Sequence, residues 1–441
     1  YLVPPHRLPY LSRTMAIPIL LAFAASTALF TLILYERYFL QNFLDNFTLL
    51  LLTLTLSVSL ASLASLLLLR TTRAETIRRI WLALTTTALT YAAVDLIAGW
   101  ILMPPLSPAL VGDETVHHRL LPDTRSALYN RDYSYLQRVN KLGLRGPDID
   151  TRKPAGTYRI AMLGDSFIMG KGVTDDQTGA WLLEQALRRD GHRVEVLNGG
   201  VDSYAPILSL LQLRTQLVPL EPDLVMLNLD MSDLLQEQAY RHRARYDADG
   251  RLVGVDGRLD QLQLTHTQKA RNWVNEHLYL SRLVVYYAQR WAHRHRGIDV
   301  ASVVGMANPG VLAHTLASDR GDRDGQWQTL FTSILAIRDE CAGRGIDFTL
   351  VTYPWGHQVN AREWIPGRFA FVPEGSVISD RSLERIRAFA AQNGIALLDL
   401  FPAFRAYAGS APLYYRFDMH WTPAGHRLYA RELQRLVADR L

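Results

Sequence analysis

Three residues of this chain stand in contexts that would let them cooperate in acyl transfer. Ser166 follows a Gly-Asp pair at the end of the apolar run RIAMLGDS, where a strand-to-loop turn would expose its hydroxyl at a sheet edge. Asp418 and His420 stand two residues apart in FDMHWTPAGH, just before a predicted helix. In such a set the imidazole accepts the serine proton, the carboxylate orients the imidazole, and the serine forms an acyl-enzyme. The competing interpretation is that these side chains only cap a turn and the last helix.

Five sequence blocks, in this order, resemble the SGNH (GDSL-type) hydrolase family. They are VNKLGLRG, GDS, VLNGGVDSYAP, EPDLVMLNLDMSDL and DMHWTPAGH, and the resemblance runs from about Val139 to Leu441. It implies a flavodoxin-like α/β sandwich in which Ser166 is the nucleophile, His420 the general base and Asp418 the orienting acid.

The same resemblance implies an oxyanion hole with three donors. The family uses the backbone N–H of the serine, a backbone N–H of the second block and an Asn side chain of the third. Here the second donor falls on Gly199 or Gly200, of which Gly200 fits the block better, and the third position holds Ser232 instead of Asn. Loss of one such donor costs roughly 3–4 kcal/mol, so Ser232 makes slow or absent catalysis an alternative. Asn228 is expected to be buried in its strand rather than to replace the missing amide.

Strands that alternate with helices must position these residues. Short apolar runs predict strands, and amphipathic runs predict the helices between them. This alternation is typical of an α/β fold with a parallel sheet, in which ligands bind beyond the carboxyl ends of the strands, where Ser166 falls. The predicted strands are 157–164, 194–198, 223–229, 346–354 and 395–400, and the predicted helices are 178–191, 205–220, 326–343, 382–394 and 422–440.

Two segments depart from that rhythm. Residues 105–150, here called the lead-in, have scattered Pro, Asp and Arg and are expected to be irregular. They precede the hydrolase-like domain, 151–441, which carries an insertion at about 235–325. Within the insertion we expect a hairpin that turns at Asp249-Gly250 and a helix in LYLSRLVVYYAQRWAHRH.

Residues 1–104 are predicted to form a membrane anchor. Apolar runs at about 15–35, 47–69 and 80–103 reach the length of about 20 residues that a membrane-spanning helix needs. Arginines before the first run and between the second and third place the N-terminus and that loop in the cytoplasm. The large domain would then lie on the periplasmic side of a bacterial inner membrane. The sequence opens on Tyr1 rather than Met, so we expect the natural start to lie upstream.

Polar residues inside the apolar runs raise the question of a protein partner. The second run is rich in Ser and Thr, and the third contains Asp95, which is costly in lipid unless it faces protein. Packing of the three helices within the chain is the simpler interpretation of the hydroxyls. Membrane-tethered SGNH domains resemble those of polysaccharide O-acetylation systems, and this resemblance implies a multispanning partner that passes acyl groups.

Several function classes are disfavoured. Lys and Arg exceed Asp and Glu by only five and form no block that could follow a nucleic acid. The single Cys341, expected to be a buried thiol, excludes an intrachain disulfide framework and a Cys-based zinc site. His293 and His295 have no accompanying carboxylate or Cys, so we expect neither a metal site nor a cofactor.

A phosphate-binding loop is also disfavoured, although GDSFIMGKG follows a strand. Five residues instead of four separate Gly164 from Gly170, and Gly172 after Lys171 supplies no hydroxyl for magnesium. The first hypothesis is therefore a serine esterase or O-acyltransferase that acts on a cell-envelope glycan or lipid. The alternatives are a catalytically weak or inactive accessory or scaffold subunit of a membrane complex, and a non-catalytic carbohydrate-binding module.

Overall fold

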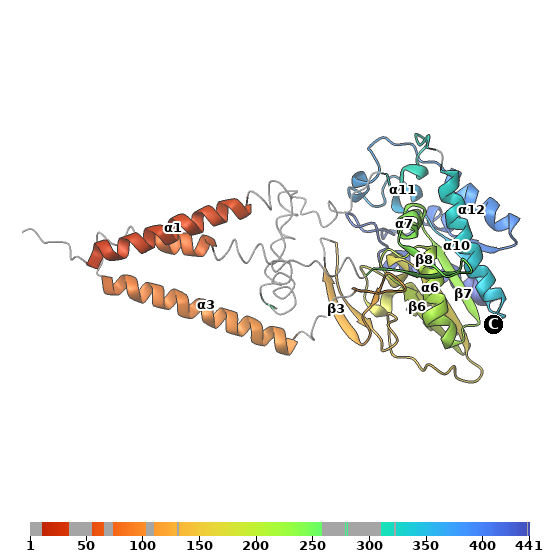
Figure 1. The fold of residues 1–441 in the computed structure, drawn as a ribbon, viewed down its shortest axis with the longest axis horizontal. Helices are drawn as coiled ribbons and strands as arrows, with labels where there is room; N and C mark the ends of the chain where they lie inside the picture. The colour runs from red at the N-terminus through yellow and green to blue at the C-terminus, as the bar shows by residue number, and fades with distance from the viewer. Residues whose placement is uncertain are drawn as a thin grey trace, which may run out of the picture. The chain divides into compact units, whose positions relative to one another are not determined.

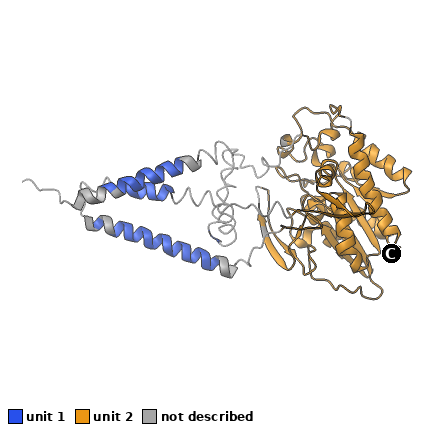
Figure 2. Ribbon diagram, viewed as in Figure 1, with its two compact units in different colours: residues 1–106, 264–302 blue, residues 107–263, 303–441 orange. Residues whose placement is uncertain are grey.

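The computed structural model of the chain divides into two compact units (Figure 2). One comprises Tyr1–Leu106 with Leu264–Ser302, and the other comprises Ser107–Gln263 with Val303–Leu441. The structure describes residues 11–34, 55–65, 74–102, 110–129, 132–257, 278, 280, 310–321, 323–438 and 440–441.

The first unit is helical where it is described. It contains α1 (Leu11–Leu34), α3 (Ala74–Leu102) and a helical segment at 55–65. Within the described residues, one helix is long and apolar enough to cross a membrane, at Arg79–Ala98, with a mean hydropathy of 1.5 over its best stretch. Ile19–Thr31 and Thr55–Ser65 are shorter apolar helices, and parts of the predicted runs 15–35 and 47–69 lie outside the described residues.

Hydroxyl groups join the helices of this unit. Ser59 Oγ lies 2.8 Å from Ser26 Oγ and accepts a hydrogen bond of 3.1 Å from Thr27. Trp81 Nε1 donates to Ser65 Oγ at 2.9 Å. Ser59 and Ser65 of the second apolar run therefore pack against other helices of the chain, as the simpler interpretation predicted for them.

The polar residue of the third apolar run faces protein. Asp95 is 1% exposed and accepts a hydrogen bond of 2.5 Å from the backbone N–H of Leu280, a residue of the insertion. Its burial follows from the high cost of leaving a carboxylate in an apolar surrounding without a donor.

The second unit is built on a five-stranded parallel sheet in the order β11-β10-β7-β5-β6, of which β6 and β7 are labelled in Figure 1. With the strands renumbered along the chain, this is the flavodoxin-like order 2-1-3-4-5. The predicted α/β class with a parallel sheet is confirmed. The strands are β5 (Tyr158–Gly164), β6 (Val194–Gly200), β7 (Leu224–Leu229), β10 (Asp347–Thr352) and β11 (Ala396–Asp399).

Helices cover both faces of this sheet. All six residues of the central β7 are buried, as expected of a strand that is covered on both sides and reads as a continuous apolar run. Helix α5 packs with α14, whereas α6, α7 and α10 pack with one another. The helices are α4 (Ser166–Met169), α5 (Gly179–Arg189), α6 (Pro206–Gln212), α7 (Asp233–Arg241), α10 (Asp324–Ala342), α11 (Gly356–Val359), α12 (Arg381–Gln392), α13 (Phe401–Arg405) and α14 (Pro423–Ala438).

Short helical turns complete the unit. The predicted helix 205–220 is α-helical only as far as Gln212. Its remaining residues form a π turn and then a 3-10 turn, which contains Pro219. The turns are η2 (Asp175–Gln177), η3 (Leu213–Leu217), η4 (Val218–Leu220), η6 (Ala313–Thr315) and η7 (Gly367–Ala370).

The expectation that the lead-in is irregular was wrong. It contains two antiparallel pairs, β1 (Leu110–Gly112) with β2 (His118–Leu120) and β3 (Thr124–Tyr129) with β4 (Ser134–Val139). The alternation of polar and apolar residues in β4 did not predict a strand, because polar Gln137 is buried (1% exposed) whereas apolar Leu136 is 58% exposed.

The insertion is described only in part. Its predicted hairpin is confirmed, since β8 (Ala244–Tyr246) and β9 (Leu252–Val255) pair antiparallel around Asp249-Gly250. The predicted helix LYLSRLVVYYAQRWAHRH, with His293 and His295, lies outside the described residues apart from Leu278 and Leu280.

His314 predicts a loss of stability in acid. Its ring is 4% exposed, and burial lowers its pKa from 6.5 to about 4. Because the folded pKa lies below the unfolded value, its contribution is complete above pH 6.5 and is lost as the pH falls toward 4. The unfolding free energy should fall by about 1.4 kcal/mol per pH unit from this residue alone.

Replacement of this imidazole by an apolar side chain should remove its share of the pH dependence. We expect His314→Leu to flatten the unfolding free energy between pH 6.5 and 4 in guanidinium titrations of the detergent-solubilised chain. Parallel pH curves for the two proteins would show that His314 does not titrate with unfolding.

Candidate active site

A sharp turn at the end of β5 carries Ser166. Gly164 adopts a φ of +155°, and Asp165 caps α4 by accepting a hydrogen bond of 2.9 Å from the N–H of Phe167. A Cβ at Gly164 would lie 2.6 Å from the Ile168 side chain, so glycine is required where the strand turns into the helix. Gly170 ends α4 in the left-handed conformation, with a φ of +90°. The turn places Ser166 at the carboxyl end of β5, as the sequence predicted.

A buried arginine from the lead-in holds the far end of this turn. Arg145 belongs to the block VNKLGLRG and is 4% exposed. Cations are favourable beside the unpaired carbonyls at a helix C-terminus. The guanidinium donates to the carbonyls of Met169 at 2.8 Å, Gly170 at 2.5 Å and Val173 at 2.5 Å, and to the Asp175 carboxylate at 2.9 Å.

The structure brings Ser166, His420 and Asp418 together. His420 Nε2 lies 2.6 Å from Ser166 Oγ, and His420 Nδ1 is hydrogen-bonded to Asp418 Oδ1. The same carboxylate oxygen accepts the backbone N–H of His420 at 3.0 Å, which fixes the loop between the two residues. All three side chains are less than 10% exposed.

The charge of Asp418 sets the roles of the two imidazole nitrogens. Burial alone would raise the pKa of Asp418, but the charge and hydrogen bond of His420, and more weakly Lys171, lower it below its ordinary value. An ionised carboxylate only accepts hydrogen bonds, so the proton of a neutral imidazole lies on Nδ1. Nε2 then presents its lone pair to the hydroxyl of Ser166, as a general base must.

Two lead-in residues that sequence reasoning missed support Asp418. Tyr133 donates its hydroxyl to Asp418 Oδ2 at 2.8 Å, and burial is the first cause that raises its pKa well above 10.0, so the phenol stays protonated. Asp132 Oδ2 accepts the N–H groups of Phe417 at 2.9 Å and of Asp418 at 2.7 Å. The contact between Tyr133 and Asp418 joins positions 285 residues apart, and no motif in the segment DYSY predicts it.

Aromatic side chains pack behind the catalytic candidates. The Phe167 ring lies 4.8 Å from the His420 ring, and it also contacts Trp355 at 5.8 Å and Trp421 at 5.1 Å, measured between ring centroids. Both tryptophans are at most 2% exposed. Trp355 Nε1 donates to Asp230 Oδ2 at 2.8 Å. This packing fixes the imidazole plane against an apolar wall.

The other two predicted oxyanion donors are engaged within the chain. The Gly200 N–H donates to Asn198 Oδ1 at 3.1 Å, and the Ser232 hydroxyl donates to Asp230 Oδ1 at 2.7 Å. Their roles in an oxyanion hole therefore remain predictions. Asn228 is buried, and its amide donates to the Leu163 carbonyl at 2.9 Å, which confirms that it belongs to the sheet.

Charged pairs surround this region. Lys171 Nζ lies 2.9 Å from Asp202 Oδ2. Burial opposes the charge on both groups, yet the pair raises the pKa of Lys171 and lowers that of Asp202, to which His420 also contributes. Burial and the neighbouring Asp230 raise the pKa of Asp165 well above 3.8.

A reactive thiol and a metal site were the remaining candidates for chemistry. Cys341 is fully buried, and burial raises the pKa of its thiol to about 12, so the interpretation as a packed thiol is confirmed. Among the residues that the structure describes, no three His, Cys, Asp or Glu side chains are grouped to hold a metal ion.

Comparison with known families adds one match. Residues 313–440 match the family model described as the SGNH hydrolase-like domain of the acetyltransferase AlgX. The matched segment contains Asp418 and His420, and Ser166 precedes it. No curated protein matches the chain.

Solved structures also resemble the chain. The crystal structure of TesA has 14% identity and a TM-score of 0.34, and the match covers 64% of this chain and 99% of TesA. A lipase/acylhydrolase from Enterococcus faecalis has 14% identity and a TM-score of 0.34, with 64% and 97% of the two chains covered. The acetyl xylan esterase AlAXEase has 15% identity and a TM-score of 0.33, with 63% and 99% covered.

The hydroxyl of Tyr133 should matter for the reactivity of Ser166. We expect Tyr133→Phe to slow covalent labelling of Ser166 by a fluorophosphonate roughly tenfold, because a hydrogen bond to a charged group is worth about 1.5–3 kcal/mol. Loss of a donor also raises the pKa of Asp418, so the defect should grow toward acid pH.

Tyr415→Phe is the matched control. The Tyr415 ring lies 5.0 Å from the Tyr133 ring, but its hydroxyl donates to the Gly172 carbonyl at 2.7 Å rather than to Asp418. Equal slowing in the two variants, with the same pH profile, would reduce Tyr133 to a packing residue.

Proposed function

The chain belongs to the SGNH-type hydrolases, and from that premise we propose that it is a serine esterase or O-acyltransferase. The observation that carries the proposal is the chain of contacts from Ser166 Oγ to His420 Nε2, at 2.6 Å, and from His420 Nδ1 to Asp418. The AlgX family description adds support for acyl transfer.

The reaction follows from these atoms. His420 Nε2 takes the proton of Ser166 while Oγ attacks the carbonyl carbon of an acyl ester. The tetrahedral intermediate collapses to a Ser166 ester, and the imidazolium returns its proton to the departing alkoxide. Water or a second alcohol then attacks the acyl-enzyme with His420 as base again. Asp418 stabilises the imidazolium throughout because its lowered pKa keeps it ionised.

The substrate and location form the finer part of the proposal. We place the enzyme in a bacterial inner membrane, with three spans, a cytoplasmic N-terminus and a periplasmic domain that acts on a cell-envelope glycan or lipid. The apolar stretch Arg79–Ala98, the shorter apolar helices Ile19–Thr31 and Thr55–Ser65, and the flanking arginines support this arrangement. A multispanning membrane protein would supply the acyl group.

A second candidate function is supported by the oxyanion donors. With the Gly200 N–H on Asn198 and the Ser232 hydroxyl on Asp230, two of the three predicted donors are committed elsewhere. A domain in that state would serve better as an accessory or scaffold subunit of a membrane complex than as a catalyst.

Fluorophosphonate labelling tests the nucleophile. The detergent-solubilised chain should be labelled at a single site, and Ser166→Ala should abolish the label. His420→Ala should slow labelling by at least about a hundredfold, since it removes the general base. An unlabelled wild-type protein, or a Ser166→Ala variant labelled as well as wild type, would exclude the esterase and acyltransferase proposals and leave the scaffold.

Ser232→Ala tests the third donor. Because the single hydroxyl proton is donated to Asp230, we expect hydrolysis of a p-nitrophenyl acetate probe to change by less than about tenfold. A fall of about 10²–10³ in kcat would instead show that Ser232 turns toward the oxyanion during reaction.

A further inference from the structure

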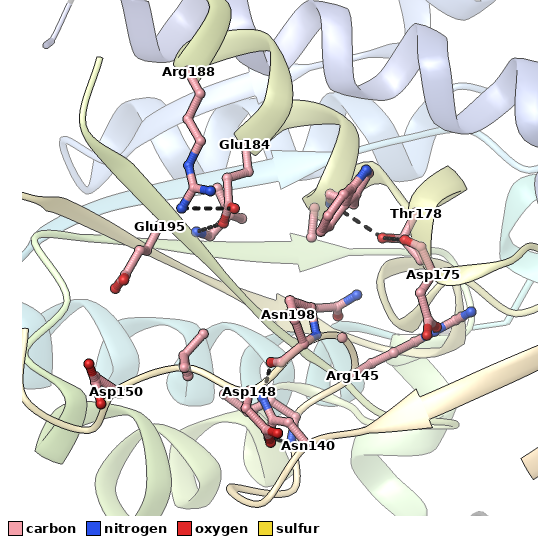
Figure 3. A pocket seen from close by; sticks show the side chains of 17 residues that line it. Asn140, Arg145, Asp148, Asp150, Asp175, Thr178, Glu184, Arg188, Glu195 and Asn198 are labelled. Carbon is pink, nitrogen blue, oxygen red and sulfur yellow. Dashed lines mark hydrogen bonds and ion pairs between the residues drawn. The ribbon is translucent and has the colours of Figure 1, made fainter. Parts of the chain in front are cut away.

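A cavity apart from the catalytic candidates, here called the second cavity, lies beside the edge strand of the sheet. It has a volume of about 420 Å3 and is bounded by the end of the lead-in, helix α5 and strand β6 (Figure 3). Ser166, Asp418 and His420 do not line it. Its volume falls within the range of about 300–1,000 Å3 that is usual for small-ligand sites.

The lining combines an aromatic side chain with apolar and polar walls. Trp181 of α5 contributes a half-buried indole, and Ile149 and Val196 add apolar surface. Across the cavity, Glu184 and Arg188 of α5 face Asp148 and Asn140 of the lead-in (Figure 3). Such a site can hold a ring with one apolar face and a polar periphery.

Most carboxylates of the lining are neutralised by arginine partners, two of which, Arg138 and Arg159, lie outside the lining. Four of its carboxylates are paired with arginines: Asp148 with Arg138, Asp175 with Arg145, Glu184 with Arg188, and Glu195 with Arg159. The exposed carboxylate of Asp150 is the exception, since no described residue donates a hydrogen bond to it or forms an ion pair with it. An incoming ligand therefore meets hydrogen-bond acceptors and a small excess of negative charge.

Open acceptors remain at this rim. Glu195 binds Arg159 through Oε2 alone, at 2.6 and 2.9 Å, so that Oε1 accepts no hydrogen bond from a described residue. Together with Asp150, this oxygen can accept two or more O–H donors from one ligand. A ligand that matches the cavity thus needs an apolar face, several hydroxyl donors and no negative charge.

We propose that this cavity binds a neutral oligosaccharide segment of a glycan. One ring packs its C–H face on the indole of Trp181, and the hydroxyls of a following ring donate to Asp150 and to Oε1 of Glu195. Uronic acids and phosphorylated sugars are disfavoured by Asp150, because a second negative charge beside its carboxylate would be repelled.

The cavity adjoins the catalytic candidates through Asn198, which lies in its lining (Figure 3). The Asn198 side chain accepts the Gly200 N–H at 3.1 Å and donates to the Met169 carbonyl at the end of α4, at 3.4 Å. A glycan held here would lie next to the segment that carries Ser166. That this glycan is the acyl acceptor or donor rests on the function proposed above, whereas the binding itself does not.

Binding can be measured without turnover. Isothermal titration of the detergent-solubilised full chain, carrying Ser166→Ala, against neutral tetrasaccharides of glucose, mannose and galactose should reveal saturable binding of at least one. Trp181→Ala should weaken it about tenfold or more, as expected for an aromatic anchor, and Asp150→Ala roughly tenfold. A tetrasaccharide of glucuronic acid should bind at least about tenfold more weakly than the neutral one.

Matched controls separate the cavity from general surface effects. Phe369→Ala removes an aromatic side chain that is 41% exposed outside the cavity, and Asp249→Ala removes an exposed carboxylate at the β8–β9 turn, so neither should change binding. Trp181→Ala is also made in the chain that retains Ser166, and fluorophosphonate labelling of this variant checks that the active site is intact.

The outcomes are decisive in both directions. Absence of binding by every neutral tetrasaccharide at millimolar concentration, or binding that Trp181→Ala and Asp150→Ala leave unchanged, overturns the site. Equal or tighter binding of the glucuronic acid tetrasaccharide overturns the proposal that the ligand is neutral. If glycan binding is found while Ser166 resists labelling, the cavity stands and the catalytic proposal fails.

Discussion

The rest of the site depends on the close approach of the nucleophile turn to the neighbouring strand. A Cβ at Gly200 would lie 2.0 Å from the backbone nitrogen of Met169, so α4 can pack on β6 only because this position has no side chain. Gly164 permits the chain to leave β5 with a positive φ on the other side of the same turn. The two glycines thus fix the backbone of the turn that carries Ser166. They hold Ser166 where His420 can reach it.

The lead-in then connects the two halves of the catalytic constellation. Arg145 fixes the carbonyls after α4, whereas Asp132 and Tyr133 fix the loop that presents Asp418. Ser166 and Asp418 come from opposite ends of the domain, and the lead-in contacts the segments that carry both. A segment outside the parallel sheet therefore braces the two loops that meet where Ser166 Oγ lies 2.6 Å from His420 Nε2.

Local signals explain what the sequence could predict. Apolar strands that end in Gly-Asp-Ser, and an Asp-x-His pair ahead of a helix, carry their chemistry within a few residues, and the parallel sheet brings them to one edge. The support from Tyr133 depends instead on a contact between residues 285 positions apart in the sequence, which no local pattern encodes. The second cavity was missed for the same reason, because Trp181 on α5 and Asp150 in the lead-in meet only after folding.

The two committed oxyanion donors differ in how easily they can be released. The Gly200 N–H is held by the neutral amide oxygen of Asn198, and an oxyanion would compete well because hydrogen bonds to a charged acceptor are about twice as strong. The Ser232 hydroxyl is held by Asp230, whose Oδ1 also accepts the N–H of Ser232 at 2.7 Å, so its rotation would break a denser network. We infer that Gly200 is the donor that this site can recruit. Since Asn198 also lines the second cavity, the side chain that holds this N–H borders the proposed glycan site.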